Sequence, residues 1–185
     1  MRPFIQFSSR FIQKCNEFYL AFHIDEDWFA ANFPRIAGFS KDYKFEPFNN
    51  SNSFVIGNAF VNNECLPVID LKKKIGMNND LVRNTGRLVV IETEVFGNTL
   101  KFAIFYDTIG DAFEVSSKRI LPTPNIGKYF TSGNIKGIHI HEDQCIMLFD
   151  FQNIFSLDDL IDIKIASGQN LVSVLSEYEN FHSFS

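Results

Sequence analysis

Residues 54–76 read FVIGNAFVNNECLPVIDLKKKIG, and residues 134–156 read NIKGIHIHEDQCIMLFDFQNIFS. The two stretches align at an offset of 80 residues, and apolar residues keep the same register in both copies. Self-similarity at a long fixed period indicates a repeated structural unit. The sequence therefore predicts two small β modules built from a duplicated unit. A structural role follows for the residues that the copies share: Gly57 with Gly137, Cys65 with Cys145, and Asp70 with Asp150.

Each copy is predicted to form a β-hairpin. The first copy predicts strands at 54–61 and 65–71 around a turn at Asn62-Asn63, and the second predicts a hairpin over 135–151 with its turn at Glu142-Asp143. Turn residues at 78–86 predict the boundary between the two halves. Apolar runs predict the remaining strands at 18–24, 28–33, 87–94, 100–106 and 112–115, and a short one near Phe45.

Helical patterns lie at the two ends of the chain. Phe4, Phe7 and Phe11 begin an apolar stripe at helical spacing, which predicts an amphipathic helix within residues 1–17. Near the other end, Ser156 precedes Asp158 and Asp159, a pattern typical of a capped helix start. The chain is therefore divided into an N-terminal helix at 1–17, a β region at 18–155 and a helical extension at 156–185.

The composition is that of a globular protein rich in phenylalanine. Hydrophobic residues make up 45% of the 185 residues, charged residues 21%, and 22 residues are Phe, so a packed core with some exposed aromatic surface is expected. The net charge is −5 and basic residues cluster only at 72–74, so no nucleic-acid partner is expected. The sequence contains no apolar run of about 18 residues, so no direct membrane span is expected.

The cysteines and the first residues both indicate the cytoplasm. Cys15, Cys65 and Cys145 are odd in number and form no C-x-x-C pair, which favours a reducing compartment. The opening residues, MRPFIQFSSR, lack the continuous apolar segment of a signal peptide. A cytoplasmic location is therefore the expectation.

No catalytic residue is predicted, because the sequence contains no P-loop, no G-x-G-x-x-G and no G-x-S-x-G motif. His139 and His141 share a strand face, which leaves open a small metal-binding protein or enzyme that uses both. Such a site needs a third ligand from elsewhere in the chain. The repeat offers another explanation, because Ala59 and Val61 hold the equivalent positions. We therefore expect no metal and no cofactor.

The first copy of the repeat, residues 54–76, and two other segments, the second of which contains the second copy except its last residue, resemble the CheW family of chemosensory adaptor proteins. These segments are RLVVIETEVFGNTLKFAIFYDTIGDAFEV at 87–115 and YFTSGNIKGIHIHEDQCIMLFDFQNIF at 129–155. The resemblance implies a mainly β fold of two SH3-like five-stranded barrels packed side by side, intertwined within residues 18–155, with peripheral helices at both ends. It also implies that the protein has no catalytic activity.

The resemblance further implies two partners, the regulatory domain of a chemotaxis histidine kinase and the cytoplasmic tip of a chemoreceptor. A divergent component of a pilus-motility chemosensory pathway is the alternative within the same class. Two positions depart from the family pattern, since Asn62 replaces a partner-contacting Arg and Gly38 stands where an acid is common. The residues expected to bind partners are Ile36, Gly38, Val55, Ile56, Asn62 and Asn63.

Overall fold

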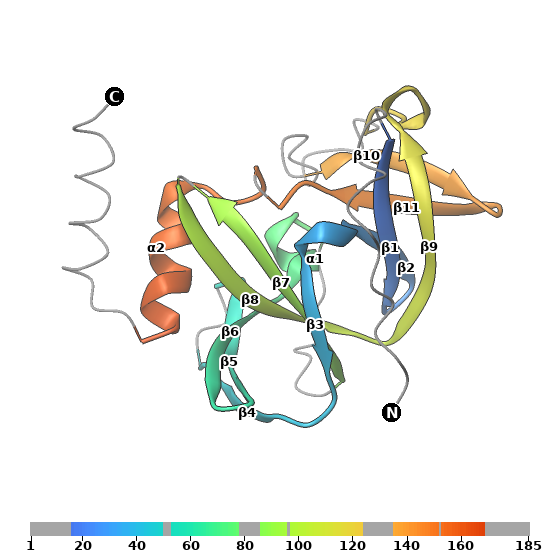
Figure 1. Ribbon diagram of the computed structural model, residues 1–185. Coiled ribbons are helices and arrows are strands. Elements are labelled where there is room, and N and C mark those ends of the chain that lie inside the picture. Colours follow the sequence, from blue (N-terminus) through green and yellow to red (C-terminus); the bar gives the residue numbers. More distant parts are fainter. Residues whose placement is uncertain are drawn as a thin grey trace.

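The computed structural model describes residues 16–49, 53–77, 86–95, 97–123, 135–151 and 153–168. Within these ranges the chain forms two curled β sheets with a few short helices (Figure 1). The predicted mainly β, two-barrel fold is confirmed, except that one sheet holds six strands, not five. The helix predicted at 1–17 lies outside the described residues apart from its last two, which already belong to a strand. The extension beyond residue 168 also lies outside them.

The elements follow the chain in an order that mixes the two sheets. The first sheet contains β3 (Ile36–Ser40), β4 (Lys44–Pro47), β5 (Val55–Val61), β6 (Glu64–Ile69), β7 (Arg87–Val95) and β8 (Asn98–Tyr106). The second contains β1 (Asn16–Ile24), β2 (Asp27–Asn32), β9 (Thr108–Ser116), β10 (Ile135–His141) and β11 (Gln144–Phe149). The helices are α1 (Leu71–Lys74) and α2 (Leu157–Ala166), with 3-10 turns at Phe33–Arg35 and Ser117–Arg119.

The repeated hairpins β5–β6 and β10–β11 have the same register. Gly57 pairs with Val68 and Gly137 with Leu148, and each hairpin has a bulge just before its glycine. Both turns contain two residues with positive φ, 49° and 67° at 62–63 and 47° and 65° at 142–143. Such backbone angles match a type I′ turn, which suits the twist of a two-residue hairpin. The two copies therefore fold alike, down to the conformation of the turn.

The two sheets also share one strand order. From the repeated hairpin inward, the six-stranded sheet runs β5-β6-β8-β7-β3, with β4 added outside β5, and the five-stranded sheet runs β10-β11-β2-β1-β9. In each sheet the hairpin joins its neighbour in parallel, at Val68 beside Ala103 and at Leu148 beside Ala30. The duplication therefore extends from one hairpin to a whole five-stranded unit.

The chain changes sheets between β2 and β3 and again between β8 and β9. The boundary predicted at 78–86 falls, apart from Gly86, outside the described residues, and the flanking strands β6 and β7 belong to the same sheet. The two units are intertwined because the first strands of the described chain join its last hairpin.

Three groups of buried apolar residues pack the described fold. One lies within the six-stranded sheet around Leu66 and Phe105, and one within the five-stranded sheet around Tyr19 and Leu148. The third, which we call the shared core, takes residues from both sheets and from α2, among them Phe22, Phe29, Ile91, Phe102, Leu160 and Ile163. The two sheets are therefore joined by an apolar interior and not only by their connecting chain.

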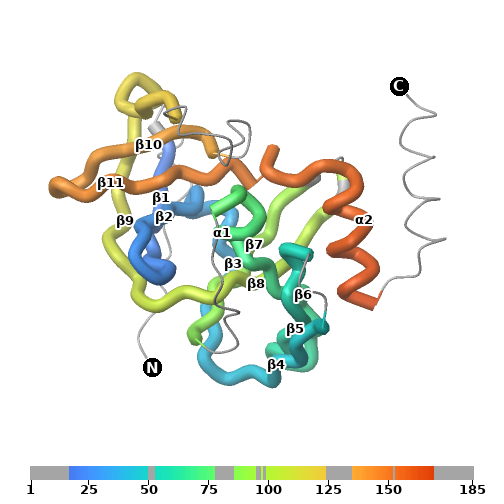
Figure 2. Tube along the Cα trace, turned by 180° about the vertical axis from the view of Figure 1, so that it is seen from behind, coloured from blue at the N-terminus to red at the C-terminus, as the bar shows by residue number. Residues whose placement is uncertain are grey.

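Ion pairs and a hydrogen bond connect the two helices to the sheets and to each other. Lys72 Nζ of α1 lies 2.7 Å from Asp27 Oδ2 and 3.2 Å from Asp25 Oδ2, beside the turn between β1 and β2. Lys74 Nζ lies 2.5 Å from Asp159 Oδ2 of α2. The helix α2 lies along β5 and β6 (Figure 2), where its end is held by Asn58. These contacts tie α1 to the five-stranded sheet and α2 to the six-stranded one.

Replacing Asp70 by alanine should lower the free energy of unfolding by about 1 kcal/mol, the usual cost of losing a helix N-cap. Asp70 Oδ1 accepts a hydrogen bond of 3.0 Å from the Lys73 N–H at the start of α1. Urea unfolding measures the loss.

Asp70→Asn provides the matched control, because it keeps the acceptor and removes the charge. Burial raises the pKa of the Asp70 carboxyl, so its ionised form costs stability above that pKa. The asparagine variant should then be at least as stable as wild type at neutral pH, and any advantage should shrink as the pH falls through the raised pKa. If both variants lost the same free energy of unfolding, the capping role would be contradicted.

Candidate partner-binding surface

The segment Phe33–Ser40 carries the chain from the five-stranded into the six-stranded sheet. β2 ends at Asn32, and Pro34 then occupies the first turn of a 3-10 helix, where its missing N–H costs nothing. β3 follows and pairs with β7, with a bulge between Ile36 and Gly38. β3 is the terminal strand of its sheet, so its second edge carries no strand among the described residues. The segment is thus exposed along one side.

Apolar side chains face solvent along this segment. Phe33 is 40% and Phe39 45% exposed, and Ala37 between them is also exposed. Phe39 is held in place by an edge-on contact with Tyr106, with ring centroids 5.9 Å apart. Ile36 points the other way and packs against the shared core. We call the exposed residues Phe33, Pro34, Ala37 and Phe39 the crossover surface.

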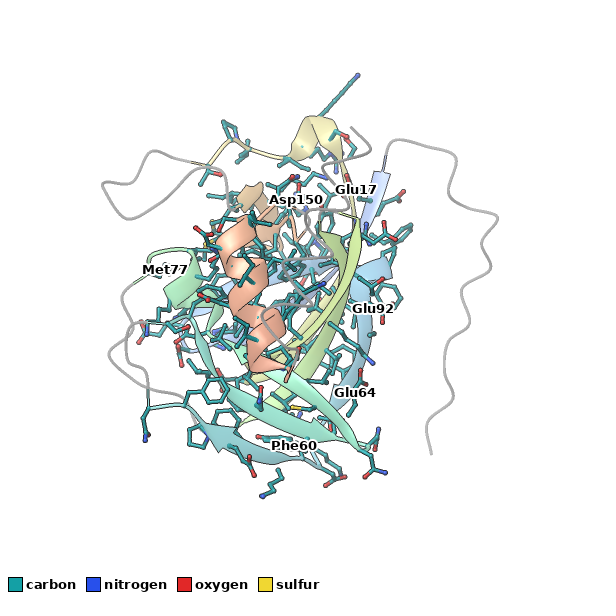
Figure 3. The ribbon with its side chains drawn as sticks, turned by 90° about the vertical axis from the view of Figure 1, so that its left-hand side faces the viewer. Glu17, Phe60, Glu64, Met77, Glu92 and Asp150 are labelled. Carbon is teal, nitrogen blue, oxygen red and sulfur yellow. The ribbon has the colours of Figure 1, made fainter. Side chains whose placement is uncertain are left out.

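A cavity of about 380 Å³ adjoins this segment at Pro34 and Arg35. Its other walls come from β1, β10 and the end of β11, including Glu17, Lys136 and Asp150. Figure 3 shows Glu17 and Asp150 at the same end of the molecule. The cavity therefore lies where the crossover segment leaves the five-stranded sheet.

Glu17 is the centre of a hydrogen-bond network in the cavity wall. Its Oε2 accepts from the Tyr19 hydroxyl at 2.8 Å and from Asn32 Nδ2 at 2.9 Å, and Oε1 is paired with Lys136 Nζ. Burial alone would raise the pKa of Glu17, but the bonds from Lys136, Tyr19 and Asn32 outweigh it and lower the pKa. Burial and the neighbouring Glu17 raise the pKa of Tyr19. Glu17 thus has three partners and Tyr19 is bonded to it, which suits a rigid wall better than an acid or base.

The structure separates the residues that the sequence predicts as partner-binding. Ile36 and Gly38 lie together on β3, within the crossover segment. Val55 and Ile56 are 3% and 9% exposed and belong to the cores, so they are not available to a partner in this structure. Their apolar character, which suggested a binding role, serves the packing of β5 instead.

The remaining two predicted residues, Asn62 and Asn63, are exposed at the other end of β5 from Val55, roughly 23 Å away at the usual rise per residue. Figure 3 shows Phe60 and Glu64, which flank this turn, at the opposite end of the molecule from Glu17 and Asp150. The positive φ of Asn62 gives a local reason for an asparagine where the family resemblance places an arginine.

Sequence reasoning missed Phe33 and Phe39. The sequence predicts a strand at 28–33, which ends at Asn32 in the structure, and predicts no strand over Ile36–Ser40. The alternation of half-buried and exposed residues over Ile36–Ser40 is the period-two pattern of a strand, but this pattern is weak because the strand has only five residues and three of them are small.

None of the helices among the described residues is long and apolar enough to span a bilayer.

Comparisons with known proteins agree with one another. The model of the CheW-like domain matches residues 19–159. Chemotaxis protein CheW of Rhizobium meliloti (strain 1021) is 23% identical over 140 residues, which cover 76% of this chain and 88% of that protein. The crystal structure of the scaffolding protein TtCheW from Thermoanaerobacter tengcongensis aligns with a TM-score of 0.62 at 18% identity, covering 80% of this chain and 94% of that one. The structural match concerns the fold.

Proposed function

The chain belongs to the CheW-like domain family, and from this membership we propose that it is a non-enzymatic signalling adaptor that couples chemoreceptors to a chemotaxis histidine kinase in the cytoplasm. The match over residues 19–159 carries the proposal, because it includes both sheets and the start of α2. The similar proteins named above are called a chemotaxis protein and a scaffolding protein, which supports the same class of function.

The architecture suits such an adaptor. Coupling requires that two partners be held at a fixed separation, and the shared core makes one packed body of the two sheets. Each sheet then offers its own outer surface. The partly buried ion pairs of Lys72 and Lys74 add fixed points between the sheets and α2.

We assign the crossover surface to the kinase regulatory domain. Protein interfaces gain most of their affinity from a few buried aromatic side chains surrounded by polar residues. Phe33 and Phe39 supply such side chains, and Arg35 belongs to the same segment. Phe39 is already held against Tyr106, so little freedom is lost when a partner covers it. The proposal adds Phe33 and Phe39 to Ile36 and Gly38.

Phe39→Asp should weaken binding to the kinase regulatory domain by at least about tenfold, the effect of losing one apolar anchor. Gly38→Glu should also change the affinity without harming the fold, because a Cβ at Gly38 would meet nothing within 4 Å. Isothermal titration calorimetry with the purified kinase domain measures both, and thermal unfolding checks that the variants remain folded.

Ile165→Asp is the matched control, since Ile165 is an exposed apolar residue on α2. It should leave the affinity unchanged. Asn62→Gly tests the hairpin turn separately, because glycine accepts the positive φ while removing the side chain. If Phe39→Asp binds as wild type while Asn62→Gly does not, the kinase contact lies at the turn and the crossover assignment is wrong.

A further inference from the structure

Three potential metal ligands lie close together at the two edge strands of the five-stranded sheet, β9 and β10. Asp111 comes from β9, His141 ends β10, and Glu142 begins the turn that follows. Their ligand atoms all lie within 4.8 Å of one another. β9 and β10 are the terminal strands of that sheet, so this group links its two edges.

Aromatic packing positions the imidazole of this group. The Phe113 ring of β9 stacks on His141 with centroids 4.7 Å apart, and on His139 at 5.3 Å. His141 thereby has a fixed ring plane while its Nε2 still faces Asp111. The Asp111 side chain is 71% exposed and can move toward a ligand without disturbing the core.

His139 lies two residues before His141 on β10, outside the group of three ligands. It is 8% exposed, and its Nδ1 is buried with no hydrogen-bond partner among the described residues. A buried nitrogen without a partner is costly and uncommon in a folded protein. Its ring lies 6.2 Å from that of His141 on the same side of β10.

We propose that Asp111, His141 and Glu142 bind one divalent cation of the zinc type, with water completing the coordination. One imidazole and two carboxylates form a ligand set that Zn²⁺ accepts, and a three-ligand site leaves a fourth position open. His141 Nε2 and Asp111 Oδ2 are 3.9 Å apart, too far for a hydrogen bond. Two ligands on a tetrahedral zinc are separated by roughly 3.4 Å, so a small movement of Asp111 suffices.

The cation would join β9 to the β10–β11 turn, where no strand pairing connects the two among the described residues. This site differs from the pair His139 and His141 that the sequence suggests, because Asp111 supplies the ligand that was missing and Glu142 replaces His139. This bridging role is independent of the adaptor function proposed above.

Calorimetric titration of the chelator-treated full chain with Zn²⁺ tests the site. One-to-one binding is expected, together with a rise in the thermal unfolding temperature, and Co²⁺ should give the visible absorption bands of a nitrogen- and oxygen-ligated ion. Asp111→Asn should weaken binding by at least about tenfold, since loss of even an outer-sphere partner costs 10- to 100-fold. Asp111 is exposed, so this variant should fold as wild type.

Asp143→Asn is the matched control, because Asp143 is the other exposed acid of the same turn and lies outside the group. Its affinity should equal that of wild type. The proposal would be overturned if the chain showed no saturable Zn²⁺ binding, or if Asp111→Asn and Asp143→Asn reduced the Zn²⁺ affinity equally.

Discussion

Replacing Phe102 by alanine should destabilise both sheets together, by about 3–5 kcal/mol. Phe102 lies on β8, is fully buried in the shared core, and contacts Phe151 and Phe155 edge-on with centroids 5.7 and 5.2 Å apart. Its loss removes apolar contacts and leaves a cavity between the sheets. Because the shared core includes residues from both, neither sheet keeps its packing when that cavity forms.

The single tryptophan makes this prediction testable, because its fluorescence reports on one sheet whereas circular dichroism reports on both. Trp28 lies on β2 of the five-stranded sheet, whereas Phe102 belongs to the six-stranded one. Denaturant unfolding followed by Trp28 fluorescence and by far-ultraviolet circular dichroism should give coincident midpoints, both shifted in Phe102→Ala. Phe102→Leu should shift them less, because it leaves a smaller cavity. A shift by circular dichroism with unchanged Trp28 fluorescence would show that the sheets fold independently.

Alanine at Gly57 or at Gly137 should each cost about 1–3 kcal/mol through steric overlap. A Cβ at Gly57 would lie 2.4 Å from the Glu46 carbonyl oxygen, and one at Gly137 would lie 2.5 Å from that of Leu121. Both distances are far below van der Waals contact with backbone atoms that cannot easily move. In each copy the glycine therefore allows the neighbouring chain to approach the hairpin closely.

Gly38→Ala is the control for these two variants. Gly38 also lies in a strand, but an added Cβ there meets nothing within 4 Å, so its stability should stay within about 0.5 kcal/mol of wild type. Chemical denaturation measures all three. If Gly57→Ala and Gly137→Ala are as stable as Gly38→Ala, the glycines of the repeat have no packing role.

The sequence predicted local structure well where short-range chemistry determines it. Alternating apolar residues and an Asn-Asn or Glu-Asp turn specify a hairpin without reference to the rest of the chain. Ser156 accepts a hydrogen bond from the Asp159 N–H and caps α2, as its position before two acids predicted. These features depend on neighbours only a few residues apart.

Long-range partners could not be predicted in the same way. The pairing of β2 with β11 joins segments more than a hundred residues apart, and no local pattern encodes it. The burial of Val55 and Ile56 depends on the sheets that cover them, so their apolar character could not distinguish core from binding surface. For the same reason the sequence showed His141 and Glu142 but not Asp111, which reaches them only when the barrel closes.

The adaptor proposal itself is tested most directly by reconstituting signalling from purified parts. The rate of kinase autophosphorylation is measured with a receptor cytoplasmic fragment, with and without this chain. The account predicts that the receptor fragment changes the rate only when the chain is present, and that Phe39→Asp reduces this dependence while Ile165→Asp preserves it. A receptor effect of equal size without the chain, or no effect of the chain at any concentration, would contradict the proposed function.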